Sequence, residues 1–436
     1  MLFDIIKLVM KNKIFLLAIP LLVVSCGSNS KKPVTHKVTF DGGEYLTIEK
    51  TTCEDRTKYL TKISVKDEYL NNYEAPQNIA YYEVTCDNQE IKDFRILSDL
   101  NYNSVYLEIP QEKVTGDINI KTEGYCHYLT FAGEEPGATI YFVSETVSPI
   151  IQYCNNLKNQ NWTDWVKGEE NAIKLEGDNK TIYVKNTGNS FDASFVTGDK
   201  TAPKISAHGN VMSVINFSAS SLSTLFQNCE SLISAPILPA TTLTNGCYKA
   251  MFYGCTSLIT APILPATTLV NSCYHGMFQG CTSLAIAPDL PATTLANYCY
   301  CSMFSTCSSL TIAPDLPATT LTAGCYSGMF TKAGLVQAPD LPADTLVEYC
   351  YDQMFFGCSN LVIPTQIPIN LSSNCCSLMF YNCAKLQVND KGKGTKFFAC
   401  PEGTLPQRAV EQMFEGTGGD FKGTPSAGAS YYYTVD

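Results

Sequence analysis

Several kinds of residue are scarce in this chain, and each scarcity excludes a class of function. Charged residues make up only 16% of the 436 positions, and the one basic run is the short Lys391–Lys396 segment. Nucleic-acid binding requires clustered Lys and Arg. A chain with a net charge of −11 and no such cluster is therefore not expected to bind DNA or RNA.

The residues and motifs of common catalytic sites are equally scarce. The chain has four histidines, which lie in different segments: His36, His127, His208 and His275. No G-x-S-x-G, H-E-x-x-H or P-loop pattern occurs, and no C-x-x-C pair stands near a histidine. We therefore expect no enzyme activity, no cofactor and no metal site.

A long hydrophobic run is also missing, which bears on the N-terminus. The apolar run Ile14–Leu22 follows two lysines and is shorter than the ~20 residues that a transmembrane helix needs. It leads through V-V-S into Cys26, an ending that resembles a bacterial lipobox. We expect residues 1–26 to be a lipoprotein signal, begun at Met1 or Met10, and Cys26 to carry the lipid. A membrane-spanning helix is the alternative.

What the chain has in abundance is a repeat. From residue 225 a unit of 25 or 26 residues recurs, with the pattern MF-x-x-C-x-S-L-x-x-AP-x-LPATTL-x-x-x-CY-x-x-MF. A phenylalanine is expected in the core of every unit: Phe226, Phe252, Phe278, Phe304, Phe330, Phe355 and Phe380, with Phe414 after a longer gap. One unit cannot bury its own apolar face, so the units must stack as coils of a solenoid.

Most of the cysteines belong to the repeat. Twenty cysteines would suggest a disulfide scaffold in an exported chain, but most fall at two fixed positions of the unit. One position lies three residues after the phenylalanine, as in Cys255, Cys281 and Cys307, and the other lies five residues before it. Where cysteine is missing, these positions carry small residues such as Ala333, which indicates buried free thiols.

Two β domains are expected before the repeats, at residues 35–122 and 123–212. Short apolar runs separated by Gly, Asn and Asp predict their strands, spaced in the first domain as in a small β-sandwich. Disulfides within them, Cys53–Cys86 and Cys126–Cys154, stay open. A tether at 27–34 precedes these domains, and a solenoid at 213–420 and a cap or tail at 421–436 follow them.

The inward residues of one unit predict its local structure. Within Cys247–Cys255, the Cys, Tyr, Met, Phe and Cys residues fall at i, i+1, i+4, i+5 and i+8, which indicates a short helix. The stretch after Leu258 is expected to be extended and to pair in parallel with its counterparts. Proline lacks an amide hydrogen, so this ladder must stop at or just before Pro262 and its equivalents.

The repeat also carries a family resemblance. The core M-F-x-x-C-x-S-L at 251–258 resembles the BspA-type leucine-rich repeats of bacterial surface proteins, over roughly 215–420. The 26-residue period and the LPATTL segment are similar to those of surface lipoproteins of anaerobic commensal bacteria. Residues 114–118 resemble the closing strand of immunoglobulin-like modules in such lipoproteins. The implied fold is a mostly β N-terminal part, with an immunoglobulin-like sandwich, followed by a β/α leucine-rich-repeat solenoid.

Three sets of residues are candidates for contact with a partner. A tyrosine ladder could meet a partner or pack half-buried: Tyr248, Tyr274, Tyr300, Tyr326 and Tyr351. An aspartate row could be solvated, hold Ca²⁺ weakly or mark the footprint of a basic partner: Asp289, Asp315 and Asp340. The only tryptophans, Trp162 and Trp165, could stack on a sugar or anchor their domain.

The resemblance implies a function in binding. Such proteins are exported, lipid-anchored to the outer membrane and exposed at the cell surface, where they adhere to host, matrix or bacterial proteins. Variation of the two residues after M-F from unit to unit favours this reading. Capture of glycans by Trp162, Trp165 and tyrosines is the first alternative, and a passive spacer is the second.

Overall fold

The chain forms two compact units, Met1–His127 and Tyr128–Asp436, each described here by itself. The computed structural model describes residues 128–145, 150–156, 161–188, 191–214, 222–238 and 240–435, and the β-strands of the first unit. These residues are mostly β, as expected. Their helices are three short 3₁₀ turns: η3 (Glu169–Asn171), η4 (Gly177–Asn179) and η5 (Val211–Val214).

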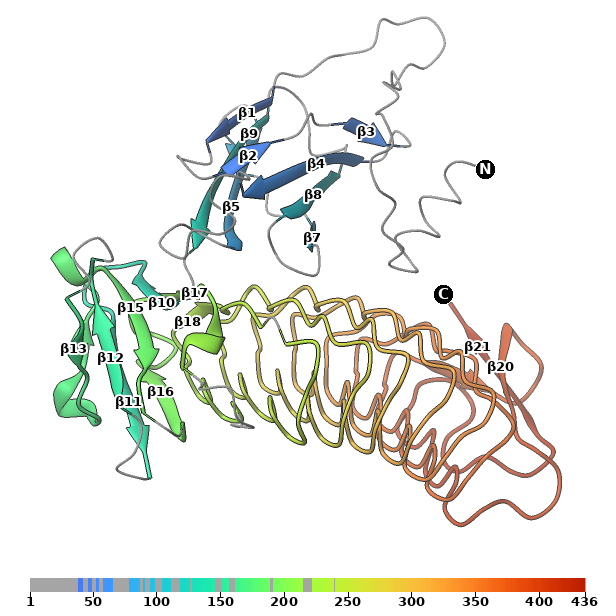
Figure 1. The fold of residues 1–436 in the computed structure, drawn as a ribbon. Coiled ribbons are helices and arrows are strands. Elements are labelled where there is room, and N and C mark those ends of the chain that lie inside the picture. The colour runs from blue at the N-terminus through green and yellow to red at the C-terminus, as the bar shows by residue number, and fades with distance from the viewer. Residues whose placement is uncertain are drawn as a thin grey trace, which may run out of the picture. The chain divides into compact units, whose positions relative to one another are not determined.

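The first unit contains two sheets (Figure 1). One sheet has the order β1 (Val38–Asp41), β9 (Ile118–Tyr125), β5 (Asn78–Cys86) and β6 (Gln89–Glu90). The other has the order β2 (Leu46–Ile48), β4 (Lys58–Val65), β8 (Ser104–Pro110) and β7 (Arg95–Ser98), with β3 (Thr52–Glu54) also paired to β4. All pairs are antiparallel except β1 with β9.

The second unit begins with two sheets over residues 128–214 that continue into the repeats. The larger sheet has the order β13 (Thr163–Asp164), β12 (Ile151–Cys154), β15 (Thr181–Asn186), β10 (Leu129–Gly133), β17 (Ile205–His208) and β18 (Leu232–Ser234). The smaller has the order β14 (Ile173–Lys174), β11 (Thr139–Ser144) and β16 (Ala193–Thr197). In the first unit and in residues 128–214, strands form over the apolar runs that predicted them, whereas β3, β6, β7, β13, β16 and β17 were not anticipated, nor were the three strands after residue 386.

The β segment 128–214 supplies the first layer of the repeat array. Strand β17 pairs in parallel with β18, which belongs to the first repeat. Phe195 of β16 stacks on Phe226 with ring centroids 5.8 Å apart, and its carbonyl oxygen accepts the Cys229 thiol at 3.1 Å. Five later repeats make the same thiol contact with the repeat before them, and the phenylalanine stack continues through them, so β16 replaces a preceding coil and covers the open apolar end.

The expected helix in each coil is absent, and this part of the prediction was wrong. Residues 244–255 instead form consecutive tight turns, which we call the turn ribbon. Alternate amides bond across coils, as Tyr248 N–H does to Cys273 O at 3.0 Å. The amides between them bond three residues back, as Met251 N–H does to Tyr248 O at 3.2 Å. A helix would direct every amide four residues back within its own coil.

The expected parallel ladder is present, one residue wide. Thr260 bridges Ser234 on one side and Ile286 on the other, and Gln337 bridges Ile312 and Ile363, all in parallel. Thr260 lies two residues before Pro262, so the ladder ends where the sequence predicted. Figure 1 shows the result as a row of similar coils side by side.

A three-stranded sheet covers the last coil. Its order is β19 (Gln387–Asn389), β21 (Ser430–Thr434) and β20 (Thr395–Ala399), so the last strand of the chain lies between two strands formed by residues 387–399. Phe397 of β20 packs edge-on against Phe380 and Phe414, with ring centroids 6.1 and 5.7 Å away. The last rings of the phenylalanine stack are therefore covered by an aromatic side chain and not exposed to solvent.

Candidate functional site: the outward faces of the repeat array

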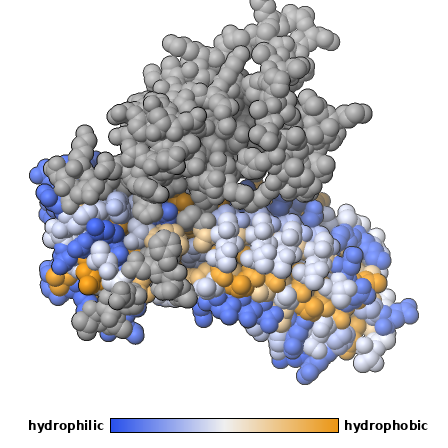
Figure 2. All heavy atoms as spheres, viewed as in Figure 1, coloured by the Kyte–Doolittle hydropathy of each residue, from blue (hydrophilic) through white to orange (hydrophobic). Residues whose placement is uncertain are grey.

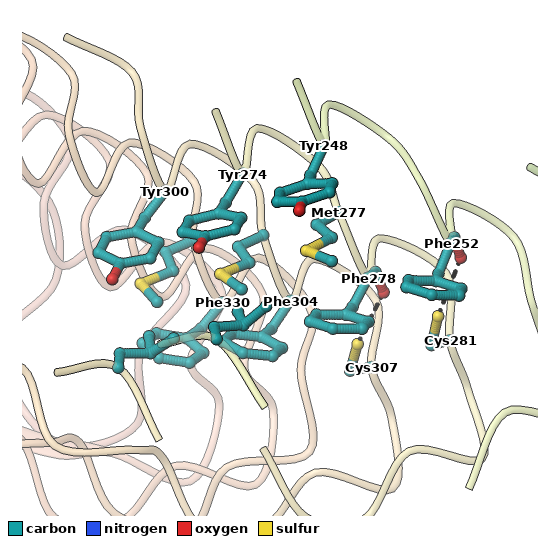
Figure 3. Packing of buried hydrophobic residues seen from close by; sticks show 14 of the residues in the cluster. Tyr248, Phe252, Tyr274, Met277, Phe278, Cys281, Tyr300, Phe304, Cys307 and Phe330 are labelled. Carbon is teal, nitrogen blue, oxygen red and sulfur yellow. Dashed lines mark hydrogen bonds between the residues drawn. The ribbon is translucent and has the colours of Figure 1, made fainter. Parts of the chain in front are cut away.

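The interior of the array consists of rows of identical side chains, one residue from each coil. The residues that do not belong to these rows form the outward faces. The Phe252 and Phe278 rings lie 5.7 Å apart and are nearly parallel at 4°, and this geometry recurs from coil to coil. Rings at such distances attract one another beyond their burial. Figure 3 shows the phenylalanines in one row, with tyrosines and methionines in rows beside them.

The tyrosine ladder belongs to this interior, which corrects its proposed role in surface contact. Tyr248 is 3% exposed, and Tyr274, Tyr300, Tyr326 and Tyr351 are each 1% exposed. Their rings stack at 5.8 to 6.1 Å. A side chain enclosed by its neighbours in this way cannot touch a partner, so the tyrosines are core residues.

The cysteines three residues after phenylalanine form a second ladder, of thiol hydrogen bonds. Each thiol donates to the phenylalanine carbonyl one coil earlier, as Cys281 does to Phe252 O and Cys307 to Phe278 O, both at 3.1 Å (Figure 3). Burial raises the pKa of the Cys307 thiol to about 12, so it stays protonated and able to donate. The position therefore selects a small apolar donor.

The cysteines of the array are free thiols, as predicted. All but Cys301, which is half-buried, are buried among the described residues. Cys154 in β12 is likewise free, so it does not form the disulfide with Cys126 that the sequence left open. The side chains of Cys53, Cys86 and Cys126 lie outside the described residues, as does the proposed lipidation site Cys26.

The outward residues of the turn ribbon vary, and we call this surface the turn face. Every fourth residue of the ribbon has positive φ, as Gly246, Ala250 and Gly254 do in one coil (φ 65°, 52° and 73°). Most outward positions change side chain from coil to coil, as Tyr253, Gln279 and Thr331 do at one position. Tyr253, Tyr298 and Tyr349 have exposed aromatic rings, and one adjacent pair, Phe356 and Tyr381, stacks on this surface. The same backbone thus presents a different surface at each coil.

Side chains on the turn face lean over glycines of the next coil. A Cβ on Gly324 would lie 2.3 Å from the Tyr298 ring, and a Cβ on Gly357 would lie 3.0 Å from the Lys332 side chain. The pairs Asn228 with Gly254 and Asn382 with Gly416 have the same relation. Glycine therefore creates room for an outward side chain one coil earlier, in addition to permitting positive φ.

One outward row carries ionisable and nucleophilic groups. It contains, coil by coil, Lys249, His275, Cys301, Ser327 and Asp352. Burial raises the pKa of the Cys301 thiol and lowers that of the His275 imidazole, which leaves both neutral near pH 7. A nucleophilic cysteine needs thiolate character. The row is therefore not set up for thiol catalysis, and no metal-binding group of three or more His, Cys, Asp or Glu occurs in the described part of the chain.

A second outward surface, which we call the ladder face, is apolar and acidic. In four successive coils the two residues after the repeat leucine are exposed, and one of them is large and aliphatic. Ile259 (56%) and Val336 (47%) follow the leucine directly, and Ile286 (54%) and Ile312 (73%) lie one position later. We call these four residues the ridge. The aspartates Asp289, Asp315 and Asp340 follow it and are exposed, as the sequence suggested. Figure 2 shows an apolar band running along the array.

The two tryptophans anchor their segment. Trp165 is 5% exposed, packs against Phe142 and Tyr153, and donates its indole N–H to Asn171 O at 3.3 Å. Trp162 is half-buried, meets Tyr128 edge-on and has the Lys185 Nζ 3.9 Å from its ring centroid. A shallow cavity of about 340 Å³ lies beside Trp165, but the ring itself is enclosed. The tryptophans are therefore poor stacking platforms.

No protein-family model, curated protein or solved structure matches the chain. No helix among the described residues is long and apolar enough to cross a membrane.

Proposed function

We propose that this protein is a surface-anchored lipoprotein that adheres to other proteins through the outward faces of its repeat array. In this proposal the array is a leucine-rich-repeat solenoid of the BspA kind, built from turns in place of helices, and residues 35–122 are an immunoglobulin-like module. Cys26 carries the lipid in the outer membrane, and the array faces a host, matrix or bacterial protein.

One observation carries the proposal: side chains of the same array are constant inside and varied or apolar outside. The Phe and Tyr rows keep one residue type through successive coils. The turn face instead mixes aromatic, amide and charged side chains, and aromatic rings such as Tyr298 and Tyr349 suit protein contacts because they are rigid and amphipathic. A spacer needs the constant interior but has no use for exposed aromatic and aliphatic rows.

Adhesion by this array would gain from repetition. Weak contacts on successive coils of a rigid scaffold act together, because the first contact raises the effective concentration for the next. The glycan alternative has less support, since Trp165 is buried and Trp162 is covered by Tyr128 and Lys185.

The test is a binding panel with surface variants. The full chain is tested against immobilised matrix proteins, bacterial cells and glycans, beside a triple variant that replaces Tyr298, Tyr349 and Ile312 by serine. We expect protein binding that the triple variant loses while its unfolding midpoint stays close to wild type, because these side chains are at least a third exposed. Binding to glycans alone would favour the alternative, and no binding at all would leave the spacer.

A further inference from the structure

The ridge exposes a large aliphatic side chain in four successive coils, and the charges of the surrounding residues indicate the chemistry of its partner. Between residues 250 and 331 the only charged residues are Asp289 and Asp315. From 332 to 384 there are four more carboxylates, on Asp340, Asp344, Glu348 and Asp352, and a single lysine, Lys332. Residues 250–384 thus carry six carboxylates and one lysine, so the part of the array that holds the ridge has a net negative charge.

This charge excludes several occupants of the ridge. A second copy of the chain would bring two aspartate rows together, and like charges at an interface cost several kcal/mol. Anionic membranes and nucleic acids would be repelled in the same way. A partner that covers Ile286 and Ile312 therefore needs apolar side chains flanked by Lys or Arg.

The repeat distance of the array selects the secondary structure of that partner. Equivalent rings in successive coils lie 5.3 to 5.8 Å apart along the interior phenylalanine row. At the ladder face, where parallel bridges join the coils, bridged backbones lie ~4.8 Å apart. An α-helix advances ~5.4 Å per turn, so side chains at i, i+3/i+4 and i+7 recur at nearly the same distance. A β-strand repeats its outward side chains every ~6.6–6.8 Å and loses register within a few coils.

We propose that the ridge binds an amphipathic, cationic α-helix of a partner protein, laid along the array axis. Each apolar turn of the helix lies between the aliphatic side chains of adjacent coils, as ridges fit grooves in helix packing. The basic residues of the helix face Asp289, Asp315 and Asp340. The inference rests on the proposed binding function and names the class of partner for it.

The test uses a synthetic helix of about 18 residues, with leucines on one face and lysines on the other. Its binding to the full chain is measured by fluorescence anisotropy, with a proline-interrupted peptide of otherwise equal composition as the peptide control. We expect Ile286→Ser/Ile312→Ser to weaken binding at least about tenfold. Ile369→Ser, which changes a 56% exposed isoleucine outside the ridge, should have no effect.

The charges are tested separately. Asp289→Asn/Asp315→Asn should weaken binding about threefold to tenfold, and the difference from wild type should disappear at roughly 0.5 M salt. An equal loss in the Ile369 variant, equal binding of the proline-interrupted peptide, or tighter binding of anionic vesicles than of the peptide would each overturn the inference. If the full chain binds the protein panel but not the peptide, the proposal of a helical partner is refuted and the proposed adhesion function stands. Failure of the whole panel would refute the proposed function.

Discussion

The turn face and the ladder face belong to the same coils, yet their side chains follow opposite rules. On the turn face, one outward row changes from Lys249 to His275, Cys301, Ser327 and Asp352. On the ladder face, four coils in succession expose an isoleucine or valine beside aspartates. The interior that both faces share is constant. Fold and surface are therefore encoded by separate positions of one 26-residue unit.

The largest expected effect comes from the shared interior. Phe304→Ala should reduce the free energy of unfolding by about 3–5 kcal/mol, because it leaves a cavity between two stacked rings. Urea denaturation measures the loss, with Ile312→Ala on the ladder face as the matched control. Ile312 is 73% exposed, so its truncation should change the free energy of unfolding by no more than about 0.5 kcal/mol. Equal losses in the two variants would contradict the distinction between interior and face.

A glycine pair tests the packing of the turn face. Gly324→Ala should destabilise the protein by about 1–2 kcal/mol more than Gly246→Ala, because both positions have positive φ but only the first meets the Tyr298 ring. Thermal or urea unfolding gives the difference, and Tyr298→Ala should remove it in the double variant. A difference that persists without the ring would show that backbone strain alone is responsible.

One coil lacks the buried cysteine of its neighbours, and restoring the cysteine should stabilise the protein. Ala333 is buried at the position where other coils carry a cysteine three residues after the phenylalanine. Ala333→Cys should therefore let a thiol donate a hydrogen bond to Phe304 O, as Cys307 does to Phe278 O. We expect a stabilisation of about 0.5–1 kcal/mol in urea unfolding. Ala333→Ser has a similar size but a more strongly hydrated group, and it should gain less. Destabilisation by the cysteine would mean that the neighbouring residues pack too tightly around Ala333 to admit a larger side chain.

The last single-residue prediction concerns pH. Burial raises the pKa of Asp352 from 3.8 to about 6 in the folded protein, so folding favours its protonated form. The stabilisation is present below pH about 4 and is lost as pH rises through about 6. Asp352→Asn should therefore flatten this part of the stability profile relative to wild type. An unchanged slope would show that another group titrates there.

Much of the interior was predictable from sequence, whereas the turns were missed for a definite reason. Residues at i, i+1, i+4, i+5 and i+8 suit one face of a helix, but a ribbon that repeats every four residues gives the same inward set. The distinguishing signal was present at the positions with positive φ, where Gly246 and Gly254, Gly324 and Gly328, and Asn374 and Asn382 recur at spacings of four or eight. Glycine and asparagine favour that conformation and disfavour a helix.

The faces were less predictable, because exposure depends on how coils stack. The tyrosines occupy one fixed position of the unit, and the ridge residues lie one or two residues after the repeat leucine. Both sets consist of large side chains, yet the tyrosines are buried and the ridge is exposed. The tyrosines are buried because the coils stack in register, so that each ring lies on the equivalent ring of the next coil, as Tyr248 does on Tyr274 at 5.9 Å. Sequence periodicity within one coil contains no such information.

Removal of two whole coils tests most directly whether the interior only supports the array while the faces bind. Deletion of 256–307 joins Cys255 to Ser308 in register and removes Ile259 and Ile286 from the ridge. We expect the shortened chain to unfold cooperatively, since stacked repeats depend on their neighbours, and to lose far more than a proportional share of its protein binding. A folded deletion variant that binds as tightly as the full chain would contradict this conclusion.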